Sequence, residues 1–168
     1  IASYKASLEA LAAANITTIC YNFMPILDWT RTDLRAVQPH GGAAMRFDLI
    51  DFAVFDLHIL QRAQGAESYS DTQRAAAAER FNALSDDEKK QLQRNIIAGL
   101  PGANDSWSLE DVRALLHSYK GITPAKLRSH LIDFLSEVAP CAEALGLRLC
   151  CHPDDPPFSL LGLPRVMS

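Results

Sequence analysis

The chain has 168 residues, of which 48% are hydrophobic and 21% are charged, and its net charge at pH 7 is -4. This composition is ordinary for a folded globular protein, and the acidic balance argues against nucleic-acid binding, because phosphate-binding surfaces are basic. The sequence has no apolar run of about 18 residues or more, and we expect neither a membrane span nor a secretory leader.

The cysteines are Cys20, Cys141, Cys150 and Cys151, and they fall in predicted strand or helix interiors. Free cysteine is among the most frequently buried residues, so buried thiols are expected. No CxxC spacing is present, and neighbours in a strand point to opposite faces, so Cys150 and Cys151 are not expected to pair with each other. A reducing, cytoplasmic location fits this pattern best.

The N-terminal segment is predicted to be a helix followed by a strand. Residues 1–14 place apolar side chains at helical spacing, and Asn15 suits the left-handed position that ends a helix. Residues 16–21 form a short apolar segment, which is typical of a buried strand. Asn22 follows this strand, and Pro25 then disfavours a helix in the aromatic stretch that comes next.

A hairpin and several helices are predicted for the middle of the chain. The Gly41-Gly42 pair lies between two segments that favour extended structure, which predicts a hairpin turn. Apolar spacing and N-cap serines predict helices after it. These helices are expected at about residues 48–61, 70–83, 85–98 and 108–119. The sequence Gly99-Leu-Pro-Gly102 is predicted to end the third of them.

The C-terminal part repeats the order of helix and strand. Thr123 and Pro124 supply an N-cap and a first-turn proline for a long helix, in which Pro140 is expected to introduce a kink. Gly146 ends this helix, and residues 147–151 are a second short apolar segment that predicts a strand. A helix followed by a strand at each end is typical of a β/α architecture with a parallel sheet.

These elements predict an α/β fold in a single domain that covers residues 1–168. The interval between the two strands is far longer than the about 30 residues of a plain βαβ unit. It must therefore hold a helical excursion, which we place at about residues 48–119. No internal repeat and no linker rich in Pro, Gly or Ser divides the chain.

His152 is the strongest candidate for chemistry, and it begins the sequence His152-Pro-Asp-Asp-Pro-Pro157 after the second predicted strand. The carboxyl ends of parallel strands are where α/β folds bind ligands. A neutral imidazole there binds a divalent metal through one nitrogen while a carboxylate or carbonyl orients the other. Asp154 and Asp155 are candidates for contacts with substrate hydroxyls or for support of the ligand. The alternative is a structural histidine in a tight loop with two capping aspartates, because one histidine does not make a metal site.

Two further residues are candidates for substrate binding. Asn22 ends the first strand, where its amide can meet a polar ligand; the alternative is an Asx turn that only ends the strand. In the group Asp28-Trp-Thr-Arg31, Arg31 suits a bidentate pair with a carboxylate and Trp29 suits the exclusion of water. The alternative there is a packed hairpin with a surface ion pair. The sequence contains no phosphate-binding glycine loop, nucleophile elbow or zinc-site spacing.

Two long motifs stand out in this chain, and they are Cys20-Tyr-Asn-Phe-Met-Pro-Ile-Leu-Asp-Trp-Thr-Arg-Thr-Asp-Leu34 and His152-Pro-Asp-Asp-Pro-Pro157 with Gly162-Leu-Pro-Arg165 behind it. They resemble the motifs of the mannonate dehydratase family of the bacterial hexuronate pathway. Asn95-Ile-Ile-Ala-Gly-Leu-Pro-Gly102 is also similar to that family, so the resemblance covers essentially the whole chain.

The resemblance implies a (β/α)8 TIM barrel of the xylose-isomerase-like kind. It also implies a lyase that dehydrates D-mannonate to 2-keto-3-deoxy-D-gluconate with Mn2+ or Fe2+, and His152 as one metal ligand. The further Cys, His and Asp ligands of the family belong to motifs that do not occur in this chain. A complete barrel needs about 250 residues, so we expect an internal portion of the enzyme that supplies only part of the site.

Other functions stay open at this point. One is a metal-dependent isomerase or epimerase of sugars or sugar acids on the same barrel. Another is a non-catalytic fragment whose helical excursion serves subunit contact, and whether the chain is active alone is undecided. The expected partner is a small sugar-acid substrate, with no nucleic acid and no membrane, and the sequence leaves open whether the protein is a homo-oligomer.

Overall fold

A computed structural model describes residues 1–26, 29–98 and 107–167. The contacts divide the chain into two compact units. The first unit consists of Ile1–Pro25, Gly121–Phe158 and Pro164–Ser168, and the second consists of Ile26–Lys120 and Ser159–Leu163. The prediction of a single domain is not tested by this division.

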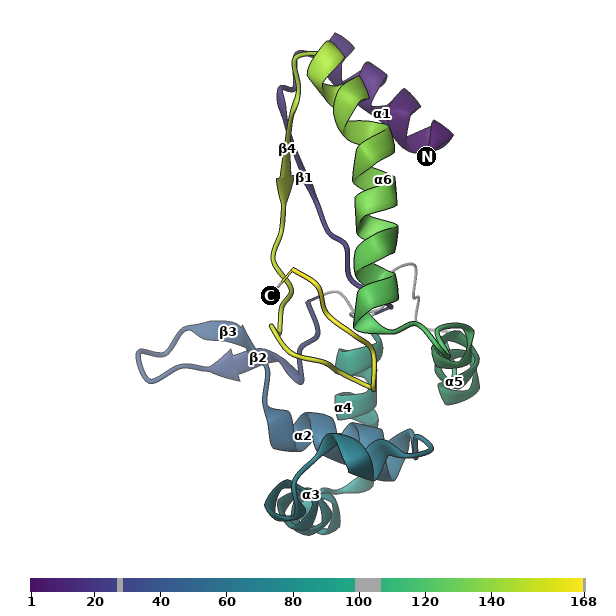
Figure 1. Ribbon diagram of the computed structural model, residues 1–168. Helices are drawn as coiled ribbons and strands as arrows, with labels where there is room; N and C mark the ends of the chain where they lie inside the picture. Colours follow the sequence, from purple (N-terminus) through teal and green to yellow (C-terminus); the bar gives the residue numbers. More distant parts are fainter. Residues whose placement is uncertain (27–28, 99–106, 168) are drawn as a thin grey trace. The chain divides into compact units, whose positions relative to one another are not determined.

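The first unit is a two-stranded parallel sheet with two helices (Figure 1). β1 (Thr18–Tyr21) pairs with β4 (Arg148–Cys151), and α1 (Ala2–Ala13) and α6 (Pro124–Ala144) precede these strands. The parallel pairing confirms the sheet that the order of elements predicts. Together with the helix-rich middle of the chain it confirms the α/β class, while the barrel stays a prediction.

One face of the β1/β4 sheet packs on α1 and α6. The buried cluster there consists of Leu8 in α1, Ala142 in α6 and Leu147 just before β4. Ile19 and Leu149, which are register partners in the two strands, pack against this cluster. The apolar side chains that predicted the strands therefore cover one side of the sheet.

The prediction of buried thiols is wrong. Cys20 and Cys150 are register partners and both are exposed, because alternation along each strand turns them away from the face that packs on the helices. Cys141 and Cys151 are only partly buried, and all of these cysteines are free thiols.

α6 begins and continues as its sequence predicts. The Thr123 hydroxyl accepts a hydrogen bond from the Lys126 N–H at 3.2 Å, and Pro124 occupies the first turn. The helix continues through Pro140 to Ala144, and whether Pro140 bends it stays a prediction. Gly146, with φ of 70°, follows the end of the helix in the left-handed region, where glycine is favoured.

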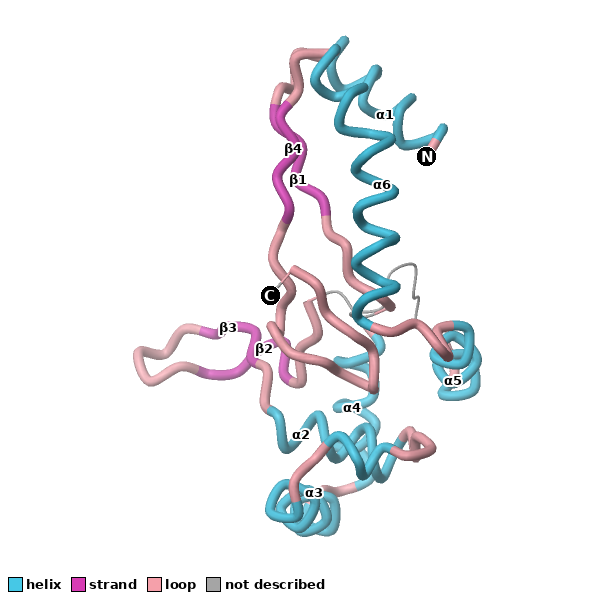
Figure 2. The backbone as a smooth tube through the Cα atoms, viewed as in Figure 1, coloured by secondary structure: helices cyan, strands magenta, loops and turns pink. Residues whose placement is uncertain are grey.

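The second unit joins a hairpin to a group of helices (Figure 2). The elements in its described part are β2 (Asp33–Val37), β3 (Ala43–Arg46), α2 (Leu49–Val54), α3 (Asp71–Ala83), α4 (Asp86–Ile97) and α5 (Leu109–Ser118). β2 and β3 are antiparallel, and Gly41 in their connection has φ of 85°. A π-helical segment, Phe55–Ile59, continues α2, and a short 3-10 helix, Gly65–Ser68, precedes α3.

Serine side chains begin α3, α4 and α5 at the predicted positions. Ser70, Ser85 and Ser108 each accept a hydrogen bond from the backbone N–H three residues later. The side chain of that later residue accepts a bond from the serine N–H in return, which makes each a capping box. The predicted helix stop at residues 99–102 lies outside the described residues.

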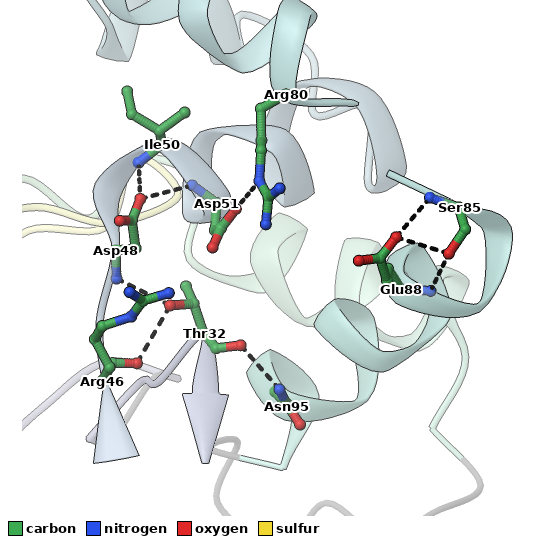
Figure 3. A network of polar contacts seen from close by, with 9 residues as sticks. All are labelled: Thr32, Arg46, Asp48, Ile50, Asp51, Arg80, Ser85, Glu88 and Asn95. Carbon is green, nitrogen blue, oxygen red and sulfur yellow. Dashed lines mark hydrogen bonds and ion pairs between the residues drawn. The ribbon is translucent and has the colours of Figure 1, made fainter. Parts of the chain in front are cut away.

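Polar bonds tie the hairpin to the helices within the second unit (Figure 3). Asn95 Nδ2 donates to the Thr32 carbonyl at 2.8 Å, and the Asp48 N–H donates to Thr32 Oγ1 at 2.9 Å. Arg80 Nε donates to Asp51 Oδ1 at 2.9 Å.

Among the described residues, none of the helices combines the length and the apolar character that a membrane crossing requires.

Candidate functional site

The carboxyl ends of β1 and β4 bring two predicted site residues next to each other. Tyr21 and Cys151 are register partners, and the His152 N–H donates to the Tyr21 carbonyl at 2.8 Å. Asn22 and His152 are thus the first residues beyond two adjacent strands. Asn22 is exposed and His152 is partly buried.

The His152 ring is oriented by the backbone of its own loop. Its Nδ1 lies 2.8 Å from the Pro153 carbonyl oxygen. A carbonyl oxygen only accepts, so Nδ1 carries the proton in this contact. In the neutral ring the lone pair is then on Nε2, and a carbonyl that orients the other nitrogen is the usual support for a metal-binding histidine.

Asp154 is 4% exposed, and its carboxylate is directed at residues 165–167. Oδ2 accepts the N–H groups of Val166 and Met167 at 3.0 and 2.7 Å. Oδ1 lies 3.8 Å from Arg165 Nη1. The predicted contact between Asp154 and substrate hydroxyls is not tested by this geometry.

These partners of Asp154 were missed by reasoning from the sequence. The Arg165 side chain is 3% exposed, yet in the sequence this arginine was noted only as part of a family motif and not as a partner of Asp154. A signal was present, because an arginine set among apolar residues and a proline requires an anion when it is buried. The neighbouring loop at residues 152–157 holds the nearest carboxylates in the sequence.

The remaining predicted residues belong to two different units. Asp155, in the first unit, is partly buried, and the peptide bond between it and Pro156 is cis. Arg31, in the second unit, is also partly buried and donates Nη1 to the Thr30 carbonyl at 2.9 Å. Trp29 is 48% exposed. Asp28, the first residue of the group that ends in Arg31, lies outside the described residues.

Two titratable side chains at the strand ends are neutral at pH 7. Burial, followed by the neighbouring Cys151 thiol, raises the pKa of Tyr21 to about 12. Burial also raises the pKa of the Cys151 thiol. Neither Tyr21 nor Cys151 is therefore suited to act as a base or as a thiolate. The Tyr21 ring also packs near aromatic neighbours, because the centroid of the Phe134 ring lies 6.4 Å from that of Tyr21 and 5.1 Å from that of Tyr4.

A complete metal site is absent from the part of the chain that the structure describes. Within residues 1–26, 29–98 and 107–167, no group of three or more His, Cys, Asp or Glu side chains is placed to hold a metal ion. His152 fits as one ligand, because a carbonyl orients its Nδ1, which leaves Nε2 as the metal-binding atom of the ring. A tightly held metal requires three or four ligands.

A polar pocket of about 220 Å³ lies in the second unit. Asp51, Arg80, Glu88 and Asn95 contribute to its lining. Most of these side chains take part in the bonds of Figure 3, such as the pair between Asp51 and Arg80 and the bond from Asn95 to Thr32. The contacts assign them structural roles, because Asn95 joins α4 to the residue before β2, Asp51 and Arg80 join α2 to α3, and Glu88 caps α4.

Known proteins match this chain along its whole length. The model of the family described as D-mannonate dehydratase (UxuA) matches residues 1–168. The mannonate dehydratase of Rhizobium meliloti (strain 1021) is 52% identical over 168 residues, which are 100% of this chain and 42% of that protein. The mannonate dehydratase of Marinomonas sp. (strain MWYL1) is 53% identical over 169 residues, or 100% of this chain and 43% of that protein.

A solved structure is also similar. The crystal structure of mannonate dehydratase from Streptococcus suis serotype 2 matches with a TM-score of 0.59 and 27% sequence identity, over 98% of this chain and 33% of that one. The chain spans 42% of the length of the first curated relative it matches. The match of the family model to every residue shows that this chain belongs to the mannonate dehydratase family.

Proposed function

We propose that the protein of which this chain forms a part removes water from D-mannonate and releases 2-keto-3-deoxy-D-gluconate. The observation that supports this most directly is the parallel pairing of β1 with β4 in a chain of this family. That pairing sets Asn22 beside His152 at the carboxyl ends of the strands, the edge at which α/β folds bind ligands.

His152 is proposed to bind a divalent metal, Mn2+ or Fe2+, through Nε2. The contact between Nδ1 and the Pro153 carbonyl supports this role. Such an ion supplies Lewis-acid stabilisation of the negative charge that develops on substrate oxygens. The other ligands are proposed to come from the enzyme outside the described residues.

Asn22 and Asp155, in the first unit, are proposed to bind the substrate, and a substrate contact by Arg31, in the second unit, is a separate proposal. The Asn22 amide offers both a donor and an acceptor to a hydroxyl, and the Asp155 carboxylate accepts a hydroxyl proton. The Arg31 guanidinium suits the sugar-acid carboxylate through two parallel hydrogen bonds. A substrate contact by Asp154 remains a weaker proposal, because its two oxygens already face residues 165–167.

The reaction breaks the C–H bond next to the carboxylate and the C–O bond of the neighbouring hydroxyl, so that water leaves and a C=C bond forms between the two carbons. The resulting enol becomes the 2-keto acid when its hydroxyl loses a proton and the second carbon gains one. A base must take the carbon-bound proton, and an acid must protonate the departing hydroxyl. Neither group is assigned to a residue of this chain. We also propose that the whole enzyme is a (β/α)8 barrel with a cytoplasmic location; the order of helix and strand supports the barrel.

The proposal is tested with His152→Ala in the full-length enzyme. We expect bound metal to be lost and dehydration to fall more than about 100-fold, because a ligand contributes more than the supporting residues around it. Metal content by mass spectrometry and release of the keto acid are the measurements. His130→Ala is the matched control, since His130 is an exposed histidine of α6 in the same unit.

Metal content and dehydration at wild-type levels in His152→Ala would contradict the assignment. The product assay also separates a dehydratase from the isomerase or epimerase alternative. A dehydratase releases a product lighter than the substrate by one water, whereas an isomerase releases a product of the same mass.

A further inference from the structure

One peptide unit links the His152 ring to the segment 165–167. The Pro153 carbonyl of this unit accepts from His152 Nδ1 at 2.8 Å, and the Asp154 N–H of the same unit donates to the Met167 carbonyl at 3.2 Å. A trans peptide unit is planar, and its C=O and N–H point in opposite directions. Fixing the N–H therefore fixes the direction from which the carbonyl meets the imidazole.

The Asp154 side chain holds the same segment through two more bonds. Its Oδ2 accepts the N–H groups of Val166 and Met167 at 3.0 and 2.7 Å. Bonds from backbone N–H groups to a carboxylate are stronger than those between neutral groups. The carboxylate is fully buried, and Arg165 Nη1 at 3.8 Å from Oδ1 offsets its charge.

We propose that Asp154 is a positioning residue, which directs the His152 ring by holding the Pro153–Asp154 peptide unit against residues 165–167. The inference rests on the proposed function, in which His152 binds the metal. In this role Asp154 acts through the backbone and the imidazole, and the role requires no contact of Asp154 with the metal or the substrate. The segment 165–167 thereby becomes part of the support of the metal ligand, as carbonyls and carboxylates are around other metal-binding histidines.

The experiment compares Asp154→Ala and Asp154→Asn with wild type in the full-length enzyme. Mn2+ affinity is measured from the electron paramagnetic resonance signal of free Mn2+, and amide hydrogen exchange is measured at residues 165–167. We expect Mn2+ to bind about 10- to 100-fold more weakly in Asp154→Ala, which is the range found when support of a metal ligand is lost. Asp154→Asn keeps one oxygen acceptor, so its Mn2+ affinity should lie between those of wild type and Asp154→Ala. Its amide exchange at Val166 and Met167 should be faster than in wild type.

Asp133→Asn is the matched control, because Asp133 is an exposed carboxylate of α6. We expect its Mn2+ affinity and its exchange at residues 165–167 to equal those of wild type. If Asp154→Ala does not fold, the less disruptive Asp154→Asn decides the question on the same two measurements.

Two results would overturn the inference. An increased KM for mannonate with unchanged Mn2+ affinity would make Asp154 a substrate contact. A lower melting temperature with unchanged Mn2+ affinity would make its role structural only. Wild-type Mn2+ affinity in His152→Ala is a different result, because it would remove the proposed metal ligand whatever the Asp154 variants do.

Discussion

Asp56 is a carboxylate with 0% exposure, and two other side chains supply its partners. Arg62 donates Nε to Oδ1 at 2.8 Å and Nη2 to Oδ2 at 2.7 Å, and the Tyr69 hydroxyl donates to Oδ2 at 3.0 Å. Burial, followed by the Asp56 charge, raises the pKa of Tyr69, so its hydroxyl stays a donor at physiological pH. These bonds offset the cost of removing the Asp56 charge from water.

Arg62→Met is expected to lower the free energy of unfolding by about 3–5 kcal/mol, because it leaves a buried carboxylate without its cation. Urea denaturation of the full-length enzyme measures this loss. Lys90→Met is the control, since Lys90 Nζ lies 3.9 Å from the exposed carboxylate of Asp87 and water screens that pair. Similar losses in the two variants would show that the pair between Asp56 and Arg62 does not have the predicted importance.

The candidate site could be predicted from the sequence only in part. His152 and Asn22 each follow a short apolar strand, and parallel strands end at the same edge, so local patterns suffice to bring them together. The direction of the Asp154 side chain depends on the path of residues 165–167, which lack a helical or strand period. Its backbone partners, Val166 and Met167, therefore could not be inferred from spacing.

The starts of helices were predictable for a physical reason. A capping box joins residues three apart, so the bond between Ser85 and Glu88 is visible as a sequence pattern. The end of α2 was less predictable, because its apolar spacing does not distinguish an α-helix from a π-helix. There, the Leu60 N–H donates to the Phe55 carbonyl, five residues earlier, at 2.7 Å. This spacing is that of a π-helix, and tertiary packing must select it over the α-helical one.

The capping box of α4 predicts a pH dependence. Glu88 Oε2 accepts from Ser85 Oγ at 2.7 Å and from Ser85 N at 2.8 Å, and these bonds hold the pKa of Glu88 below its ordinary value of 4.5. The folded-state pKa is thus lower than the unfolded one. The stabilisation is complete above the unfolded pKa and is lost as the pH falls through the folded pKa.

Glu88→Gln is therefore expected to lower the melting temperature near pH 7, because the neutral amide is a weaker acceptor and lacks the favourable charge at a helix N-terminus. The difference from wild type should shrink as the pH falls from the unfolded-state pKa through the lower folded-state pKa, because Glu88 is then protonated in both states. Thermal melts across this pH range provide the measurement. Glu79→Gln, at an exposed position of α3, is the control. A difference that stays constant as the pH falls through this range would contradict the prediction.

Across the whole molecule, each unit is assembled from segments that are distant in the sequence. The second unit includes the helical excursion, which the long interval between the strands predicted. It also includes Ser159–Leu163, whose Leu160, Leu161 and Leu163 are buried in its core cluster. No local pattern predicts that Ser159–Leu163 packs in the second unit, because a short apolar turn has no periodicity that indicates its packing partner.

The expected single domain predicts that the two units unfold together. Leu8→Ala and Ile96→Ala each remove a side chain from the core of one unit, where Leu8 is 1% and Ile96 is 0% exposed. Each substitution should cost about 2–5 kcal/mol. In one cooperative domain, either loss lowers the protection of the most slowly exchanging amides in both units by the same amount.

Hydrogen exchange of the full-length enzyme, followed at the amides of β4 and α4, tests this coupling. Ile132→Ala is the control, since Ile132 is 57% exposed and its truncation should leave both sets of amides unchanged. Faster exchange confined to the unit that carries the substitution would mean that the chain contains two domains. Equal effects in both units would mean that the strand ends beside His152 owe part of their stability to the helical excursion, because a cooperative domain shares one free energy of unfolding.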